Sequence, residues 1–115
     1  MKSTLNRAEV TSYRKSKSSN PTRKGFGLML GCSLRDRWVT KDAKEIVLDL
    51  EGGPQGIRVR LRDGFWNKCP EFLADEVYDW IIGQGLPIPW PNRQPHLFAL
   101  ERITGTHFRA MKQSI

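Results

Sequence analysis

Cys69, His96 and His107 are the residues whose chemistry would suit a nucleophile and its base. A cysteine just before a helix can have its pKa lowered by the helix dipole, and a nearby histidine can then accept its proton. Nothing in the sequence brings either histidine close to Cys69, and no nucleophile motif surrounds it. We therefore interpret Cys69 as a buried, unreactive thiol, and predict that the chain has no catalytic residues and is not an enzyme.

The same residues, taken together with Cys32, do not form a metal-binding pattern. Structural zinc sites usually take ligands in close pairs such as CxxC, and these four residues are too widely spaced for that. Phosphate-binding glycine loops need a lysine and a strand-to-helix setting, which the stretches GFG and EGGPQG lack. The sequence therefore predicts neither a metal nor a cofactor.

An arginine row occupies every second position of the stretch GIRVRLRD, where Arg58, Arg60 and Arg62 alternate with apolar residues. Such a row could follow successive phosphates of a nucleic acid, because residues two apart on a strand lie about 6.6–6.8 Å apart. An acidic row precedes it on what reads as the adjacent strand: Glu45, Asp49 and Glu51. Opposite charges on neighbouring strands stabilise a sheet, so we expect the arginines to pair with these carboxylates rather than with phosphates.

Residues 1–25 carry most of the net positive charge. They hold seven of the 19 Lys and Arg residues against one acidic residue, whereas residues 26–115 hold 12 basic and 11 acidic ones. Their polar, Ser- and Lys-rich composition predicts a disordered arm. Such an arm can bind nucleic acid with little sequence specificity by releasing counterions from phosphates, although a tail that binds nothing specific would look the same. The candidate nucleic-acid-binding residues are Lys2, Arg7, Arg14, Lys15, Lys17, Arg23 and Lys24.

Two tryptophans suggest a second candidate surface. Trp38 stands among basic residues in RDRWVTKD, and Trp90 lies in the proline-rich segment 86–95. Exposed groups of this kind can stack on bases or bind a protein partner. Equally, a tryptophan can supply core volume or lie beneath an arginine of the same chain. We take Trp38, Trp90 and Arg93 as a candidate interaction surface.

Alternating apolar and polar residues predict two antiparallel hairpins, and a short apolar segment predicts a further strand. The stretch from Pro70 to Gly83 predicts the principal helix, because its apolar residues recur at helical spacing and a glycine ends the run. The expected fold class is α+β, with a mainly antiparallel sheet of about five strands and one principal helix (residues about 70–83) packed on one face. The predicted strands are at 27–33, 45–51, 57–62, 98–100 and 108–110.

No apolar run approaches the roughly 20 residues needed to cross a bilayer, and MKSTLNRAEV lacks the hydrophobic stretch of a secretory signal. We expect a cytoplasmic protein with one compact domain at residues 26–115 behind the arm at 1–25. The functional hypothesis is a small non-enzymatic accessory protein whose arm contacts nucleic acid. The alternative is a protein–protein interaction module that uses segment 86–95 or an edge of the sheet. The sequence leaves the physiological partner, the choice between DNA and RNA, and the oligomeric state open.

Overall fold

A computed structural model describes residues 6–14, 25–68, 70–88, 90 and 94–112. The helices are α1 (Cys32–Trp38), α2 (Asp63–Asn67) and α3 (Asp75–Gly83). The strands are β1 (Arg7–Arg14), β2 (Phe26–Met29), β3 (Glu45–Leu50), β4 (Ile57–Arg60), β5 (Glu71–Leu73), β6 (Leu97–Thr104) and β7 (His107–Met111).

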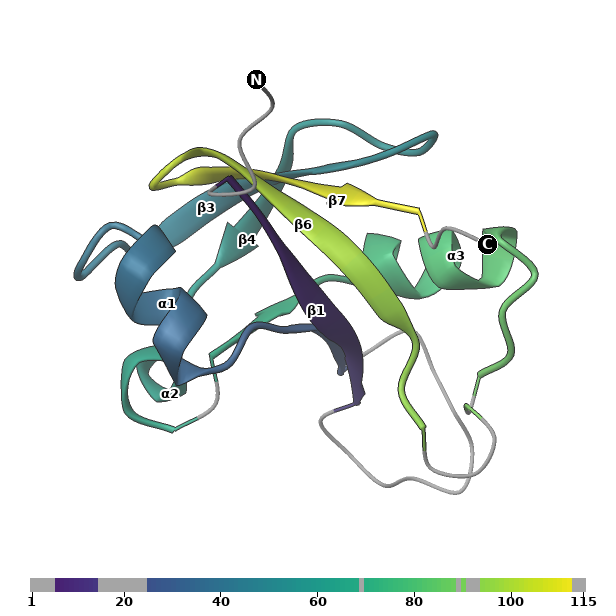
Figure 1. Cartoon of the computed structure of the whole chain (residues 1–115), viewed down its shortest axis with the longest axis horizontal. Coiled ribbons are helices and arrows are strands. Elements are labelled where there is room, and N and C mark those ends of the chain that lie inside the picture. Colours follow the sequence, from purple (N-terminus) through teal and green to yellow (C-terminus); the bar gives the residue numbers. More distant parts are fainter. Residues whose placement is uncertain (1–5, 15–24, 69, 89, 91–93, 113–115) are drawn as a thin grey trace.

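The strands form one mixed sheet in the order β4-β3-β7-β6-β1-β2-β5. Neighbouring strands are antiparallel, except that β3 and β7 run parallel. The sheet curls until its two edge strands, β4 and β5, approach each other without pairing, so that it resembles a nearly closed barrel (Figure 1). The helices α1 and α2 lie together near one end of the curled sheet, and α3 lies near the other end (Figure 1).

The α+β class is confirmed, but the five-strand sheet and the one-helix arrangement are wrong. Both predicted hairpins form: Ile46 is opposite Val59 in β3 and β4, and Leu100 is opposite Ala110 in β6 and β7. The two additional strands are β1 and β5, which come from segments predicted as arm and as helix. They extend the sheet around the core and bring its edges together.

The first helical turn predicted at Pro70 is instead the start of β5, and α3 begins only at Asp75. The strand forms because Gly27 of β2 admits a close neighbour. A methyl group at Gly27 would overlap the carbonyl oxygen of Phe72 and lie 2.8 Å from Leu73 Cα. Val77, Trp80 and Ile81 of α3 are buried, which confirms the predicted apolar face of the helix at these three residues.

The prediction of a disordered arm is wrong for residues 7–14, which form β1 between β6 and β2. Val10 and Ser12 of this strand are 1% and 2% exposed. The buried Ser12 hydroxyl accepts a hydrogen bond from the His96 amide at 2.8 Å, and the Ser12 amide donates to the His96 carbonyl at 2.8 Å. These bonds satisfy a polar group that would otherwise be costly to bury. The rest of the predicted arm, residues 1–5 and 15–24, lies outside the described residues.

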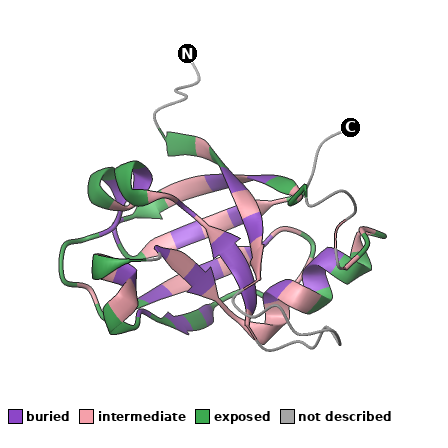
Figure 2. Ribbon diagram, turned by 90° about the horizontal axis from the view of Figure 1, so that it is seen from below, coloured by how far each residue is buried: buried purple, intermediate pink, exposed green. Residues whose placement is uncertain are grey.

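Aromatic rings fill the interior of the barrel. The Phe72 ring lies 5.4 Å from that of Phe108 and 5.9 Å from that of Phe65, and Trp38 of α1 stacks on Phe108 at 6.4 Å. Burying one such ring contributes about 1.5–3 kcal/mol to the free energy of unfolding. Buried positions alternate with more exposed ones along the strands (Figure 2), as a barrel with a packed interior requires. The outer positions of the strands are therefore free to form a surface site.

Candidate anion-binding pocket

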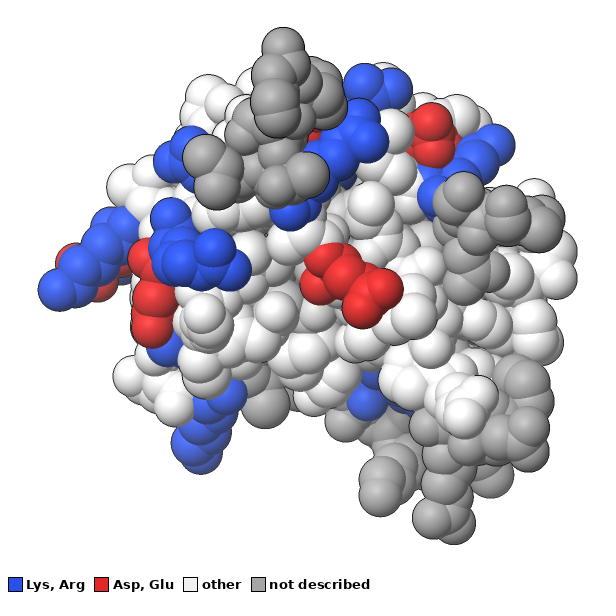
Figure 3. Space-filling model, in the orientation of Figure 1, with Lys and Arg blue, Asp and Glu red and all other residues white. Residues whose placement is uncertain are grey.

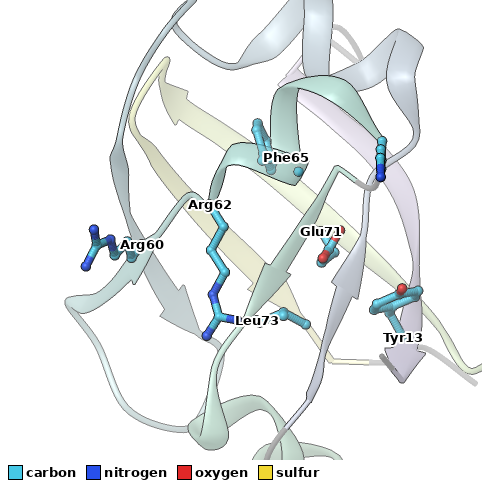
Figure 4. Close-up of a pocket in the computed structure, with 8 residues that line it drawn as sticks. Tyr13, Arg60, Arg62, Phe65, Glu71 and Leu73 are labelled. Carbon is cyan, nitrogen blue, oxygen red and sulfur yellow. The ribbon is translucent and has the colours of Figure 1, made fainter. Parts of the chain in front are cut away.

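A pocket of about 330 Å³ opens on the outer surface where the edge strands β4 and β5 approach each other (Figure 4). One continuous stretch of chain, from Arg60 at the end of β4 to Leu73 at the end of β5, supplies most of its lining, and β1 adds Tyr13. The lining residues are Tyr13, Arg60, Arg62, Gly64, Phe65, Lys68, Glu71 and Leu73.

Three cations stand around this pocket against the single carboxylate of Glu71. The side chains of Arg60, Arg62 and Lys68 are exposed. Within the described part of the chain, none of the three makes a hydrogen bond or ion pair through its side chain. Their charges are therefore available to an anionic ligand.

The short helix α2 fixes the spacing of these cations. Arg62 immediately precedes α2, and Lys68 follows it, with the Lys68 amide donating to Gly64 O at 2.7 Å. The end of the helix is secured by Arg35 of α1, whose Nη1 donates to the carbonyl oxygens of Phe65 and Trp66 at 3.1 Å each. Arg35 also lies over the Trp66 ring, with 5.7 Å between guanidinium carbon and ring centroid. Arg35 thus holds the pocket wall in place, and its guanidinium group is engaged in contacts within the protein.

The strands β1 and β5 contribute Tyr13, Glu71 and Leu73 to the lining of the pocket. The register places Tyr13 opposite Gly27 of β2, and Gly27 opposite Leu73. Because side chains alternate between the faces of a strand, Tyr13 and Leu73 both stand on the outer face. These strands thus line the pocket with a phenol ring, a carboxylate and an aliphatic side chain.

Elsewhere on the outer face the charges are balanced. The register aligns Asp49 with Arg109, Arg109 with Glu101, and Glu101 with Arg7, across four neighbouring strands. Arg7 Nε lies 3.8 Å from Glu101 Oε2. Acidic and basic side chains are interspersed on the face that β1 and β6 present (Figure 3). Such alternation favours pairing within the sheet over binding of a polyanion.

The predicted cross-strand ion pairs form at only one of the three strand arginines. Arg58 contacts Glu45 Oε1 through Nη2 at 2.9 Å and Nε at 3.2 Å, which confirms the prediction there. The prediction is wrong for Arg60 and Arg62, because the carboxylates of Asp49 and Glu51 accept hydrogen bonds from other groups. Asp49 contacts His107 Nε2 at 2.8 Å and the Gly56 amide at 2.7 Å, and Glu51 accepts from the Lys112 amide at 2.7 Å.

Asp49 joins the turn after β3 to the parallel strand β7. Burial raises the pKa of its carboxyl, but hydrogen bonds from the Gly56 amide and from His107 act against it, as do the positive charges of His107 and Arg109. The balance holds the pKa of Asp49 below its ordinary value. This carboxylate is therefore a charged structural link on the barrel wall.

The predicted nucleic-acid-binding residues fall into two groups. Arg7 and Arg14 lie at the ends of β1, where Arg7 faces Glu101 and the Arg14 guanidinium carbon lies 6.0 Å from the Phe26 ring centroid. The others lie outside the described residues: Lys2, Lys15, Lys17, Arg23 and Lys24. Four of those five belong to segment 15–24, which joins Arg14 to Gly25 and contains no acidic residue. In the sequence, this basic segment begins two residues after Tyr13.

The candidate interaction surface does not hold for Trp38, which is 5% exposed and packed on Phe108. Its carbonyl accepts a hydrogen bond from Arg102 Nε at 2.9 Å. Trp90 is partly buried, with edge contacts to Phe26 at 6.0 Å and to His96 at 5.9 Å. Arg93 lies outside the described residues.

Among the described residues, Cys32 lies in α1, His96 just before β6, and His107 in β7. Cys32 is exposed at the start of α1 as a free thiol, and Cys69 lies outside the described residues. His96 Nε2 lies 2.8 Å from Pro87 O, and His107 contacts Asp49. Among the residues with described positions, no group of three or more His, Cys, Asp or Glu side chains could hold a metal ion.

No protein-family model, curated protein or solved structure matches this chain. No helix in the described ranges is both long and apolar enough to span a bilayer.

The sequence alone does not indicate the pocket. Its patterns place Arg60 and Arg62 in ion pairs, Tyr13 in a disordered arm, and Glu71 and Leu73 in a helix, and they assign nothing to Lys68. The missing information was long-range: only the return of β5 to β2, and of β1 to the same face, brings these side chains together.

Proposed function

We propose that this protein binds nucleic acid with little sequence specificity, and that the pocket cations form the centre of the interface. The observation that carries the proposal is the set Arg60, Arg62 and Lys68, three exposed cations around one pocket without an ion pair among the described residues. Across β3, β7, β6 and β1 the register alternates acidic and basic residues, so that part of the outer face offers a polyanion less.

Segment 15–24, which follows β1 in the sequence, holds four further cations and no acidic residue. Together with the pocket cations, these charges would neutralise several phosphates. Binding of this kind depends on counterion release, so it is strongly salt-dependent and nearly indifferent to base sequence.

The test is charge removal at the pocket in the full chain. The variant Arg60→Gln, Arg62→Gln, Lys68→Gln should bind a fluorescein-labelled oligonucleotide about 100-fold more weakly at about 0.1 M salt, since three phosphate contacts are lost. The slope of log affinity against log salt concentration should become about 2 less steep, at roughly −0.7 per contact for a single strand. Fluorescence anisotropy between about 50 and 200 mM salt measures both quantities.

The matched control is Arg58→Gln, on the same strand β4. Its side chain is 76% exposed but paired with Glu45, so its loss should leave the affinity and the slope nearly unchanged. A second triple variant removes three exposed cations that do not line the pocket: Arg37, Lys41 and Lys112. If it loses as much affinity as the pocket variant, total charge alone matters, which would contradict the proposal. Truncation of the N-terminal residues is not a usable test, because it removes β1 from the middle of the sheet.

A further inference from the structure

We propose that the pocket accommodates one unstacked nucleotide of a single strand, with the base against Tyr13 and the adjacent phosphates at Arg60 and Arg62. The protein would then distinguish single strands from duplexes. This inference rests on the proposed nucleic-acid-binding function and names the form of nucleic acid that the same site takes.

The size of the pocket favours a single nucleotide. A volume of about 330 Å³ lies at the lower end of the range of about 300–1,000 Å³ found for small-molecule sites. A duplex could touch only the rim, because its bases are stacked inside the double helix and its backbone is the part that it exposes. A single strand can turn one base out of its stack and into such a pocket.

The pocket is also divided chemically in the way that a nucleotide is. Figure 4 shows Tyr13 and Glu71 on one side of the pocket, and Arg60 and Arg62 on the other. A phosphate is therefore attracted to the arginine side. The opposite side presents a π-face, on which bases of any identity can stack.

Beside the π-face, the Glu71 carboxylate lines the same pocket and can accept a hydrogen bond from a ring amino group, as acidic side chains do from cytosine. A bare phosphate would use only the cations, whereas a nucleotide would use both sides.

The first experiment compares single and double strands. An oligonucleotide of about 12 nucleotides, within the site sizes of ~4–16 nucleotides seen for single-strand binders, is measured alone and as a blunt duplex with its complement. The full-length protein should prefer the single strand at least fivefold. Tyr13→Leu should weaken single-strand binding by about 5- to 150-fold, the equivalent of ~1–3 kcal/mol of stacking, and should leave duplex binding unchanged.

The matched control is Tyr13→Phe, which keeps the ring and removes only the hydroxyl, and should therefore bind as the wild type does. Both variants are checked by thermal melting followed by circular dichroism. Tyr13 stands on the outer face of β1, so both variants should fold with the circular dichroism spectrum of the wild type.

The second experiment separates a base site from a phosphate site. Adenosine 5′-monophosphate and ribose 5-phosphate carry the same phosphate, but only the first has a base. Adenosine 5′-monophosphate should displace the oligonucleotide at a concentration at least about fivefold lower, because only it can stack on Tyr13. In Tyr13→Leu this difference should disappear.

The outcomes separate the two proposals. If the wild type binds no oligonucleotide at about 50 mM salt, the proposed function and this inference both fail. If it binds, and charge removal at the pocket weakens binding, but duplex and single strand bind equally and Tyr13→Leu has no effect, only this inference fails. Equal displacement by the two monophosphates would likewise reduce the pocket to a site for phosphate.

Discussion

At the scale of single residues, partners decide what a charged side chain can do. Arg58 and Arg60 are both exposed residues of the same strand, but Arg58 is held by Glu45 at 2.9 Å while Arg60 borders the pocket. The register aligns Arg60, not Arg58, with Glu45, and the longer diagonal contact forms instead. The carboxylate that would have completed a second pair, Asp49, is held by His107 and the Gly56 amide.

The Asp49 link gives a prediction about stability and pH. The pKa of Asp49 in the folded protein is below its unfolded value, so the ionised carboxylate stabilises the folded state. This stabilisation is fully present above about pH 4 and is lost as the pH falls through the lowered folded pKa. Asp49→Asn should therefore lower the free energy of unfolding by roughly 1–3 kcal/mol at neutral pH, since a hydrogen bond to a charged group is lost. The difference from the wild type should shrink as the pH falls below about 4.

Urea unfolding at a series of pH values measures this effect. The control is Asp42→Asn, at an exposed position with φ 66°, a conformation that Asn tolerates well. That variant should follow the wild type throughout. A constant difference between Asp49→Asn and the wild type at every pH would mean that shape, not charge, is what matters at this position.

At the scale of elements, the local alternation of apolar and polar residues predicts both hairpins, but it does not predict the strands β1 and β5. Alternation in residues 45–62 specifies β3, its turn and β4, because the two strands are neighbours in the sequence. Of the inward residues of β1, Ala8 is small and Ser12 is polar, which leaves Val10 as the one sizeable apolar side chain, so the apolar signal is weak. The strand exists because β6 and β2 bind it on both edges, which no local pattern indicates.

The same limit applies to the parallel pairing of β3 with β7, and to the site. Leu48 lies beside Phe108, 60 positions further along the chain. The basic and aromatic residue types of the pocket were recognisable in the sequence, but their assembly depends on β1, β2 and β5 meeting in one register. The sequence therefore predicts which residue types could bind an anion, but not the strand pairing that brings them together in one pocket.

The pairing of β2 with β5 gives a prediction for this element. Gly27→Ala should lower the free energy of unfolding by about 1–3 kcal/mol, because the added methyl group overlaps Phe72 O and forces the strands apart. Gly83→Ala, at the end of α3, meets no atom within 4 Å and should be neutral or stabilise by up to ~1 kcal/mol. Urea unfolding compares the two. Equal stability of both variants would show that the close approach at Gly27 has no structural role.

At the scale of the whole molecule, the formal net charge of +7 is not spread evenly over the surface. One part of the barrel wall alternates acids and bases across β3, β7, β6 and β1, and so neutralises itself. The seam between β4 and β5 collects cations around a pocket. The nearly closed barrel therefore has one electrically balanced side and one side suited to anions.

The most direct test of this division is an amide chemical-shift titration of the full chain with a single-stranded oligonucleotide of about 12 nucleotides. The account predicts that the largest shift changes lie at Tyr13 and from Arg60 to Leu73, with little change around Glu101, Arg109 and Asp49. Changes centred on that balanced wall, with the seam unaffected, would contradict it.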